Sequence, residues 1–264
     1  MTSLFTPAHR GGAGEPLVLL HGFMDTWCTW DLVLPALERR HDVLAPTLAG
    51  HAGGPPLAEP VTNSTLADAV GHAMDEAGIA TAHIAGNSLG GWLALQLAAR
   101  GRARSVVALA PAGGWADDAY ESVFDLQLTL QQQVRLAAPR AELLLERPQG
   151  RRRATLLSTV NYEHIPRELL VHQMVGIAAC EGAARLVAVA RDGGYALDAE
   201  RIGCPVRIVW GTQDRLLPWP DAAERFRRDW LPHADWVVLD DVGHCPQLDV
   251  PLETAELILG FTTP

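Results

Sequence analysis

The stretch Gly86-Asn87-Ser88-Leu89-Gly90 places the strongest constraint on how this 264-residue chain folds. An apolar run typical of a buried strand ends at Ala85, and a helical pattern begins directly after Ser88. Side chains at positions 86 and 90 would crowd neighbouring backbone, so a sharp strand-to-helix turn needs glycine at both positions. Such a turn projects the serine hydroxyl above a sheet, beside the positive end of the helix. The pattern G-x-S-x-G in this context predicts a nucleophilic serine.

Short apolar runs rich in β-forming residues alternate with helical patterns along most of the chain. The predicted strands are Leu17–Leu20, Asp42–Ala45, Ala82–Ala85, Val106–Ala110, Val206–Trp210 and Trp236–Leu239. Several are apolar on both faces, which is typical of parallel strands covered by helices on both sides. Predicted helices cover residues 64–77, 89–100, 220–230 and 252–259. The alternation predicts an α/β fold built on a doubly wound, mostly parallel sheet.

Residues 113–194 interrupt this alternation, because no convincing strand pattern occurs there. The predicted helices in this segment are Tyr120–Ala137, Ala141–Glu146, Arg152–Val160 and Arg167–Arg191, with prolines at 139, 148 and 166 between them. We expect residues 1–112 and 195–264 to form the core, and residues 113–194 to form an inserted helical cap. A cap over the carboxyl ends of the strands would cover the edge where open α/β sheets bind ligands. The alternative is a helical elaboration elsewhere on the surface.

A serine hydroxyl is a weak nucleophile unless a base takes its proton. Of the ten histidines, His244 is the best candidate, because it follows the last predicted strand on a glycine-containing loop. That position lies at the same sheet edge as Ser88. Other histidines have different expected places: His83 packs within a strand, His72 lies in mid-helix, and His164 and His172 lie in the predicted cap.

The base in turn needs an acid that holds its tautomer and stabilises the imidazolium ion. Asp214 follows the predicted strand Val206–Trp210 and therefore reaches the same edge. Asp240 and Asp241 are rivals, because they lie close to His244 in sequence. We favour Asp214, because the chain order Ser, Asp, His is the one expected for this type of elbow.

An oxyanion hole is the remaining requirement for acyl transfer. One donor should be the backbone N–H of Leu89, the residue after the nucleophile. The second should come from the loop after the first predicted strand, His21-Gly22-Phe23, where the N–H of Phe23 is our candidate. We expect His21 to hold this loop through hydrogen bonds.

Taken together, these motifs resemble the α/β-hydrolase superfamily, in its branch with a helical cap. The resemblance covers the whole chain through HGF at 21–23, LAGH at 48–51, GNSLGG at 86–91, WGTQDRLLP at 210–218 and GHCPQLDVP at 243–251. It implies Ser88 as nucleophile, Asp214 as acid, His244 as base, and Phe23 and Leu89 as oxyanion donors. The loop after the second core strand departs from the family's usual Asp-x-x-Gly-His-Gly pattern, since it reads Thr-Leu-Ala-Gly-His-Ala at 47–52.

The resemblance also narrows the reaction. Relatives that open epoxides or displace halide carry aspartate at the elbow, whereas Ser88 implies attack on an acyl carbon. The HGF loop resembles that of small-ester hydrolases, so a carboxylesterase with a largely apolar substrate is the first hypothesis. Asn87 supports a rival, because the elbow GNSxGG also resembles that of hydrolases that cleave carbon–carbon bonds in ring-fission products. Thioesterase, lactonase and acyltransferase activities stay open, and a non-enzymatic ligand receptor is disfavoured by the intact triad.

Aromatic residues offer a further hint about the pocket. Trp27, Trp30, Trp92 and Trp115 could line an apolar acyl or aryl site, although ordinary core packing would explain each of them singly.

Charge and composition disfavour several other functions. The net charge is −10, which argues against nucleic acid as a partner. No histidine cluster has metal-ligand spacing, so we expect no metal and no cofactor. The N-terminus has no signal-peptide pattern, the early apolar runs are too short to insert into a membrane, and the cysteines have no CxxC spacing, so we expect a cytoplasmic protein. All 21 basic residues are arginine, which favours a GC-rich bacterial genome. No pattern indicates the oligomeric state.

Overall fold

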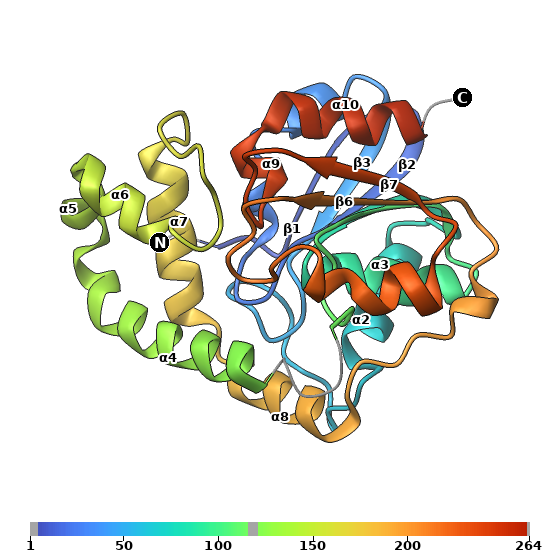
Figure 1. Cartoon of the computed structure of the whole chain (residues 1–264), viewed down its shortest axis with the longest axis horizontal. Coiled ribbons are helices and arrows are strands. Elements are labelled where there is room, and N and C mark those ends of the chain that lie inside the picture. The colour runs from blue at the N-terminus through green and yellow to red at the C-terminus, as the bar shows by residue number, and fades with distance from the viewer. Residues whose placement is uncertain (1–4, 116–120, 263–264) are drawn as a thin grey trace.

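A computed structural model (Figure 1) describes residues 5–115 and 121–262. It contains a seven-stranded sheet with the order β1-β3-β2-β4-β5-β6-β7. The strands are β1 (Ala8–Gly12), β2 (Glu15–Leu20), β3 (His41–Pro46), β4 (Ala82–Asn87), β5 (Ala103–Leu109), β6 (Val206–Gly211) and β7 (Asp235–Leu239). All six predicted strands are present, and the pairs from β3 through β7 are parallel. The α/β fold with a mostly parallel sheet is therefore confirmed.

Strand β1 is the one strand that sequence reasoning missed. It pairs antiparallel with β3 at the sheet edge, where His9 lies opposite Ala45. Its sequence, Ala-His-Arg-Gly-Gly, has no apolar run, and its residues alternate between exposed and half-buried. An edge strand is stabilised by backbone pairing with its neighbour, so a hydrophobic pattern is not required.

Helices cover both faces of the sheet, and this arrangement divides the core into two layers. The core helices are α1 (Leu34–Leu37), α2 (Thr65–Glu76), α3 (Leu89–Ala99), α9 (Pro246–Asp249) and α10 (Pro251–Thr262). One layer packs side chains of α2 and α3 against the sheet, and the other packs side chains of α1 and α10. Because β4 is buried along its whole length between these layers, the elbow at its end stands on a rigid support.

Every regular element that the structure describes between β5 and β6 is helical. It contains α4 (Glu121–Ala137), α5 (Ala141–Glu146), α6 (Pro148–Ala154), α7 (Arg167–Ala179) and α8 (Ala183–Gly193). In Figure 1 these green to orange helices form an arc beside and beneath the sheet. The predicted helix from Tyr120 is observed from Glu121, since Tyr120 lies outside the described residues. Whether 113–194 behaves as a separate cap domain stays a prediction.

Two helix predictions in this segment are wrong. The single helix expected over 167–191 is broken into α7 and α8, because Gly182 approaches the Gly50 backbone and donates an N–H bond of 2.9 Å to its carbonyl. A β-carbon at position 182 would lie within 3.0 Å of Gly50, so the break needs glycine. The helix expected over 152–160 is shifted to Pro148–Ala154. Pro148 lies in its first turn, where a backbone N–H has no partner within the helix, so the missing N–H of proline costs no hydrogen bond.

The helix predicted over 220–230 is also wrong as a continuous element. Residues Asp221–Ala223 form a 3-10 turn and Phe226–Trp230 form a π turn, with the N–H of Arg225 bonded to the Gly114 carbonyl between them.

Within residues 5–115 and 121–262, no single helix is long and apolar enough to cross a membrane, and α7 and α8 reach that length only as a pair bent by 68°.

Candidate active site

Ser88 stands at the junction of β4 and α3 with a backbone φ of 54°, in the left-handed region that a serine rarely adopts. The two glycines make the turn sterically possible. A β-carbon on Gly86 would collide with the Gly90 carbonyl, and one on Gly90 would collide with the Leu20 carbonyl. The turn is secured because the N–H of Ser88 donates to Leu109 O at 2.8 Å. These contacts hold the serine at the carboxyl edge of the sheet.

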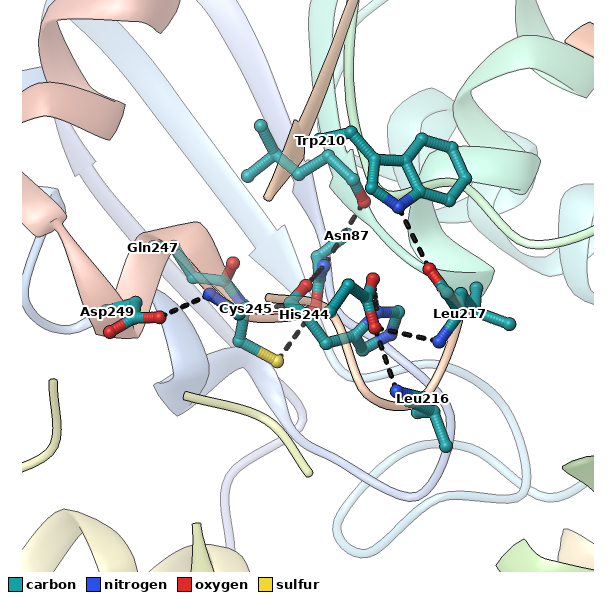
Figure 2. A network of polar contacts seen from close by, with 11 residues as sticks. Asn87, Trp210, Leu216, Leu217, His244, Cys245, Gln247 and Asp249 are labelled. Carbon is teal, nitrogen blue, oxygen red and sulfur yellow. Dashed lines mark hydrogen bonds and ion pairs between the residues drawn. The ribbon is translucent and has the colours of Figure 1, made fainter. Parts of the chain in front are cut away.

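His244 and Asp214 meet at the same edge. The Nδ1 atom of His244 lies 2.7 Å from Asp214 Oδ2, and both side chains are buried. Asp214 Oδ1 accepts hydrogen bonds from the N–H groups of Leu216 at 2.9 Å and Leu217 at 2.7 Å, and both of these residues lie to the right of His244 in Figure 2. With Nδ1–H donated to the carboxylate, Nε2 is the free basic nitrogen. It is buried and has no hydrogen-bond partner among the described residues.

The rival acids and the other histidines lie elsewhere. Asp240 and Asp241 are exposed at the turn after β7 and make no recorded bond to His244. His83 bonds to Ser105 and Glu15 within the sheet, and His164 bonds to the Leu248 carbonyl. His172 bonds to Thr26 at 3.0 Å. Each of these histidines therefore has a structural contact of its own.

The loop after β2 lies directly against the elbow. A β-carbon built on Gly22 would lie 3.6 Å from the β-carbon of Ser88, which leaves room for the two backbones to approach. His21 holds this loop, since its Nε2 accepts from Leu48 N–H at 2.8 Å and its Nδ1–H donates to Gly22 O at 2.7 Å. Burial lowers the pKa of His21 well below its usual range, so both bonds persist at neutral pH. The N–H groups of Phe23 and Leu89 donate no recorded bond within the described residues.

Asn87 supports the loop that carries His244 and does not contribute to the pocket wall. Its Nδ2 donates to the backbone carbonyl of His244 at 2.9 Å and to Leu109 O at 3.2 Å. Its Oδ1 accepts from Gln247 Nε2 at 3.1 Å and from the Cys245 thiol at 3.4 Å (Figure 2). The side chain is buried and does not line the cavity beside Ser88. The hydrogen bond that Asn87 donates to the His244 backbone therefore explains why this position carries asparagine.

Asp249 is a second support that sequence reasoning missed. Its carboxylate accepts from the backbone N–H groups of Gly243, Val160 at 3.0 Å and Asn161 at 2.6 Å. It therefore ties the loop that carries His244 to the chain between α6 and α7. The motif GHCPQLDVP contains this aspartate, but only the fold brings residues 160–161 to it.

A cavity of about 140 Å³ opens beside Ser88. It is lined by α3, by side chains of α4 and α8, and by the segment around Tyr195. Trp92 and Trp115 belong to its wall, whereas Trp27 and Trp30 do not. Trp30 packs in the opposite core layer, and Trp27 stacks on His9 and donates to Thr6. The expectation that all four tryptophans could line the site is therefore wrong for these two.

In the part of the chain that the structure describes, no charged side chain belongs to the cavity wall. Within the described residues, no group of three or more His, Cys, Asp or Glu side chains is arranged to hold a metal ion. The arrangement instead combines a serine, a carboxylate-bound histidine and an apolar recess, which is suited to nucleophilic chemistry on an uncharged group.

Comparison with known proteins places this architecture in a family. The alpha/beta hydrolase family model matches residues 17–257. The chain belongs to the alpha/beta hydrolase family. Relatives named as hydrolases support hydrolase activity for this member of the family as well.

Individual relatives carry different names. The chain is 34% identical to epoxide hydrolase EphH of Mycobacterium tuberculosis over 206 aligned residues. The aligned region covers 76% of this chain and 95% of that protein. It is 27% identical to 2-hydroxymuconate semialdehyde hydrolase of a Pseudomonas species, over 97% of this chain and 89% of that one. It is 30% identical to the dihydrolipoyllysine-residue acetyltransferase component of the acetoin cleaving system of Cupriavidus necator, but spans only 62% of that protein.

Solved structures agree on the fold. A lipase-like protein from Acinetobacter baumannii superposes with a TM-score of 0.75 at 24% identity, covering 96% of this chain and 86% of that one. The named relatives are bacterial, in keeping with the expected bacterial source.

Proposed function

We propose that the protein is a serine hydrolase that cleaves carboxylic esters with a small to medium, largely apolar acyl group. The observation that carries the proposal is the combination of Ser88 on a strained elbow, a buried His244–Asp214 pair, and a cavity wall that includes Ser88. Ser88 is the nucleophile, His244 the general base and Asp214 the acid that orients it.

The steps of the reaction correspond to these roles. His244 Nε2 takes the proton of Ser88 Oγ as the oxygen attacks the ester carbonyl carbon, and the carbonyl oxygen becomes an oxyanion. The N–H groups of Phe23 and Leu89 receive that oxyanion. The imidazolium then protonates the leaving alkoxide, which departs as an alcohol and leaves an acyl-serine. Water, deprotonated by His244, hydrolyses the acyl-serine and restores the enzyme.

Epoxide opening is the reaction named for one relative, yet the elbow residue argues against it here. An aspartate that attacks an alkyl carbon forms an ester, which water can hydrolyse. Ser88 would form an ether at that step, and this triad cannot hydrolyse an ether. Serine at position 88 therefore favours acyl transfer to water.

Cleavage of a carbon–carbon bond, the second hypothesis, loses its main support. Asn87 was the residue that favoured it, and its amide is used to hold the His244 loop. A substrate such as a muconate semialdehyde carries a carboxylate, and none of the described residues on the cavity wall has a cationic side chain to bind one. Thioester and lactone hydrolysis and transfer to another acceptor use the same residues and stay within the proposal.

A fluorophosphonate probe followed by peptide mass spectrometry tests the nucleophile directly. We expect labelling of Ser88, and turnover of p-nitrophenyl acetate and butyrate that the Ser88→Ala variant lowers by about 10⁴-fold or more. The variant should keep the wild-type unfolding curve, which separates loss of chemistry from loss of fold. Wild-type rates in folded Ser88→Ala, or no labelling, would refute the proposal.

A further inference from the structure

One face of helix α3 forms a wall of the cavity that begins at Ser88. Leu89, Trp92, Leu93 and Gln96 line it, with the spacing of three and four residues that brings side chains to one face of a helix. The first three are apolar. Gln96 is the polar residue on this face and lies two turns beyond the elbow. Packing of α3 against the sheet does not require an amide side chain at this position.

The amide of Gln96 lacks the partner that a buried amide requires. Its Oε1 atom is shielded from solvent and has no hydrogen-bond donor among the described residues. Buried side-chain oxygens are nearly always bonded, and leaving one unpaired costs free energy. The cavity wall also contains the uncharged polar side chains of Thr62, Asn63 and Gln127. An apolar recess with an unpaired amide on its wall is suited to a ligand with a polar group of its own.

We propose that the cavity binds an acyl group with an apolar body and a hydroxyl group at its far end, and that Gln96 is the residue that recognises this hydroxyl. The proposal rests on the proposed esterase function and specifies its substrate class as esters of ω-hydroxy acids. A hydroxyl group can donate to the carbonyl oxygen of the amide.

Length and charge narrow the acyl group further. Positions 88 and 96 are about 12 Å apart along the helix, at about 1.5 Å per residue. Helical side chains lean towards the N-terminus, so the amide of Gln96 lies nearer to Ser88 than its Cα atom, which leaves room for roughly five to eight chain atoms. A terminal carboxylate or ammonium is disfavoured, because no charged side chain lines the wall among residues 5–115 and 121–262.

Four methyl esters of equal backbone test the proposal on the wild-type protein: methyl hexanoate, methyl 6-hydroxyhexanoate, methyl 6-methoxyhexanoate and monomethyl adipate. We expect kcat/KM for the hydroxy ester to exceed that for the plain ester by about tenfold. The methoxy ester, which accepts but cannot donate, and the carboxylate ester should both fall below the hydroxy ester. Equal or lower kcat/KM for the hydroxy ester would overturn the proposal.

The Gln96→Leu variant tests the assigned residue. We expect the preference for hydroxy over plain ester to fall from about tenfold to about onefold. Gln132→Leu makes the same chemical change on the exposed face of α4, outside the cavity, and should keep the preference. A preference that survives in Gln96→Leu would overturn the assignment. If Gln96→Leu does not fold, the ester series on the wild-type protein still tests whether the cavity prefers a terminal hydroxyl group.

The two proposals fail differently. If Ser88 is labelled by the fluorophosphonate and the plain ester is hydrolysed, an absent hydroxyl preference rejects only the substrate class. If no ester in the series is hydrolysed and Ser88 is not labelled, the esterase function fails and the substrate class fails with it.

Discussion

At the scale of single residues, hydrogen bonds from neighbouring groups hold Asp214 and His244 of the candidate site in place. Asp214 fixes the tautomer of His244 and is itself fixed by two backbone N–H groups. Its carboxylate therefore has few alternative positions, and the ring it holds keeps Nε2 as the free basic nitrogen. Asn87 adds a bond to the His244 backbone from the strand that carries the elbow.

Asp214→Asn should lower kcat for ester hydrolysis by about 10³- to 10⁴-fold, because an amide can donate to Nδ1 and stabilise the wrong tautomer. Asp241→Asn is the matched control, since Asp241 is exposed and close in sequence, and it should change kcat little. Steady-state kinetics of the two purified variants measure the difference. The opposite ranking would move the acid to the turn after β7.

Asn87→Ala should lower kcat while leaving KM nearly unchanged, because the side chain supports His244 and does not line the cavity. It removes hydrogen bonds to Gln247 and to the His244 carbonyl, so the free energy of unfolding should fall by about 1–3 kcal/mol. Urea unfolding and steady-state kinetics on one ester measure both effects. A large rise in KM with unchanged kcat would instead indicate that Asn87 contacts substrate.

At the scale of elements, helix α7 is bonded to the loop that follows β2. Gln173 donates to Asp25 Oδ2 at 3.0 Å, and Thr26 N–H donates to Asp25 Oδ1 at 2.8 Å. Desolvation raises the pKa of Asp25 to about 6, although these bonds and one from Thr29 favour its charged form. The carboxyl group therefore titrates inside the contact between α7 and the core.

The sign of the resulting pH effect is set by linkage. Below about pH 4 both states bind the proton of Asp25, and between about pH 4 and pH 6 the unfolded chain loses it first. The contribution of Asp25 to the free energy of unfolding should therefore fall across this window and level off above it. Asp25→Asn should remove this contribution. The free energy of unfolding of the variant should therefore rise relative to that of the wild type by about 1–3 kcal/mol between pH 4 and pH 6. Urea unfolding at each pH measures it; a constant difference between the proteins would contradict the prediction.

At the scale of the whole molecule, the cavity is assembled from segments that are far apart in sequence. Tyr195, where the chain leaves α8, contacts the rings of Trp92 on α3, Trp115 after β5 and Phe124 on α4, with centroid distances of 5.0, 5.2 and 6.5 Å. Burial raises the pKa of its hydroxyl group, which stays neutral. This aromatic cluster joins the helical segment to α3, the helix that begins directly after Ser88.

Tyr195→Ala should lower the free energy of unfolding by about 2–4 kcal/mol, because the cavity left among three rings cannot close fully. It should also raise KM for apolar esters, since Tyr195 lines the cavity. Tyr195→Phe keeps the ring and serves as the control, with stability close to wild type. Chemical denaturation and ester kinetics measure these effects, and equal stability of the alanine and phenylalanine variants would exclude the joining role.

The sequence by itself determined the features that depend on local pattern. Buried parallel strands need apolar residues on both faces, so β2 through β7 can be recognised in the sequence as apolar runs. The sharp turn at Ser88 needs glycines on both sides, and these too can be recognised in the sequence. The order of Ser88, Asp214 and His244 at three strand ends is a consequence of the same alternation. Edge strand β1, the break between α7 and α8 and the short turns at 221–230 depend on partners distant in the chain, and no local pattern predicts them.

Only the tertiary structure decided what the remaining polar residues do. Asn87 is a support for His244 because residue 247 and the 244 carbonyl fold onto it, and Asp249 binds residues 160–161 because the helical segment returns to the sheet edge. Gln96 becomes a cavity residue because α4 and α8 close over that face of α3. A side chain's partners are set by packing between distant segments, and a pattern read along one chain carries no information on which segments meet.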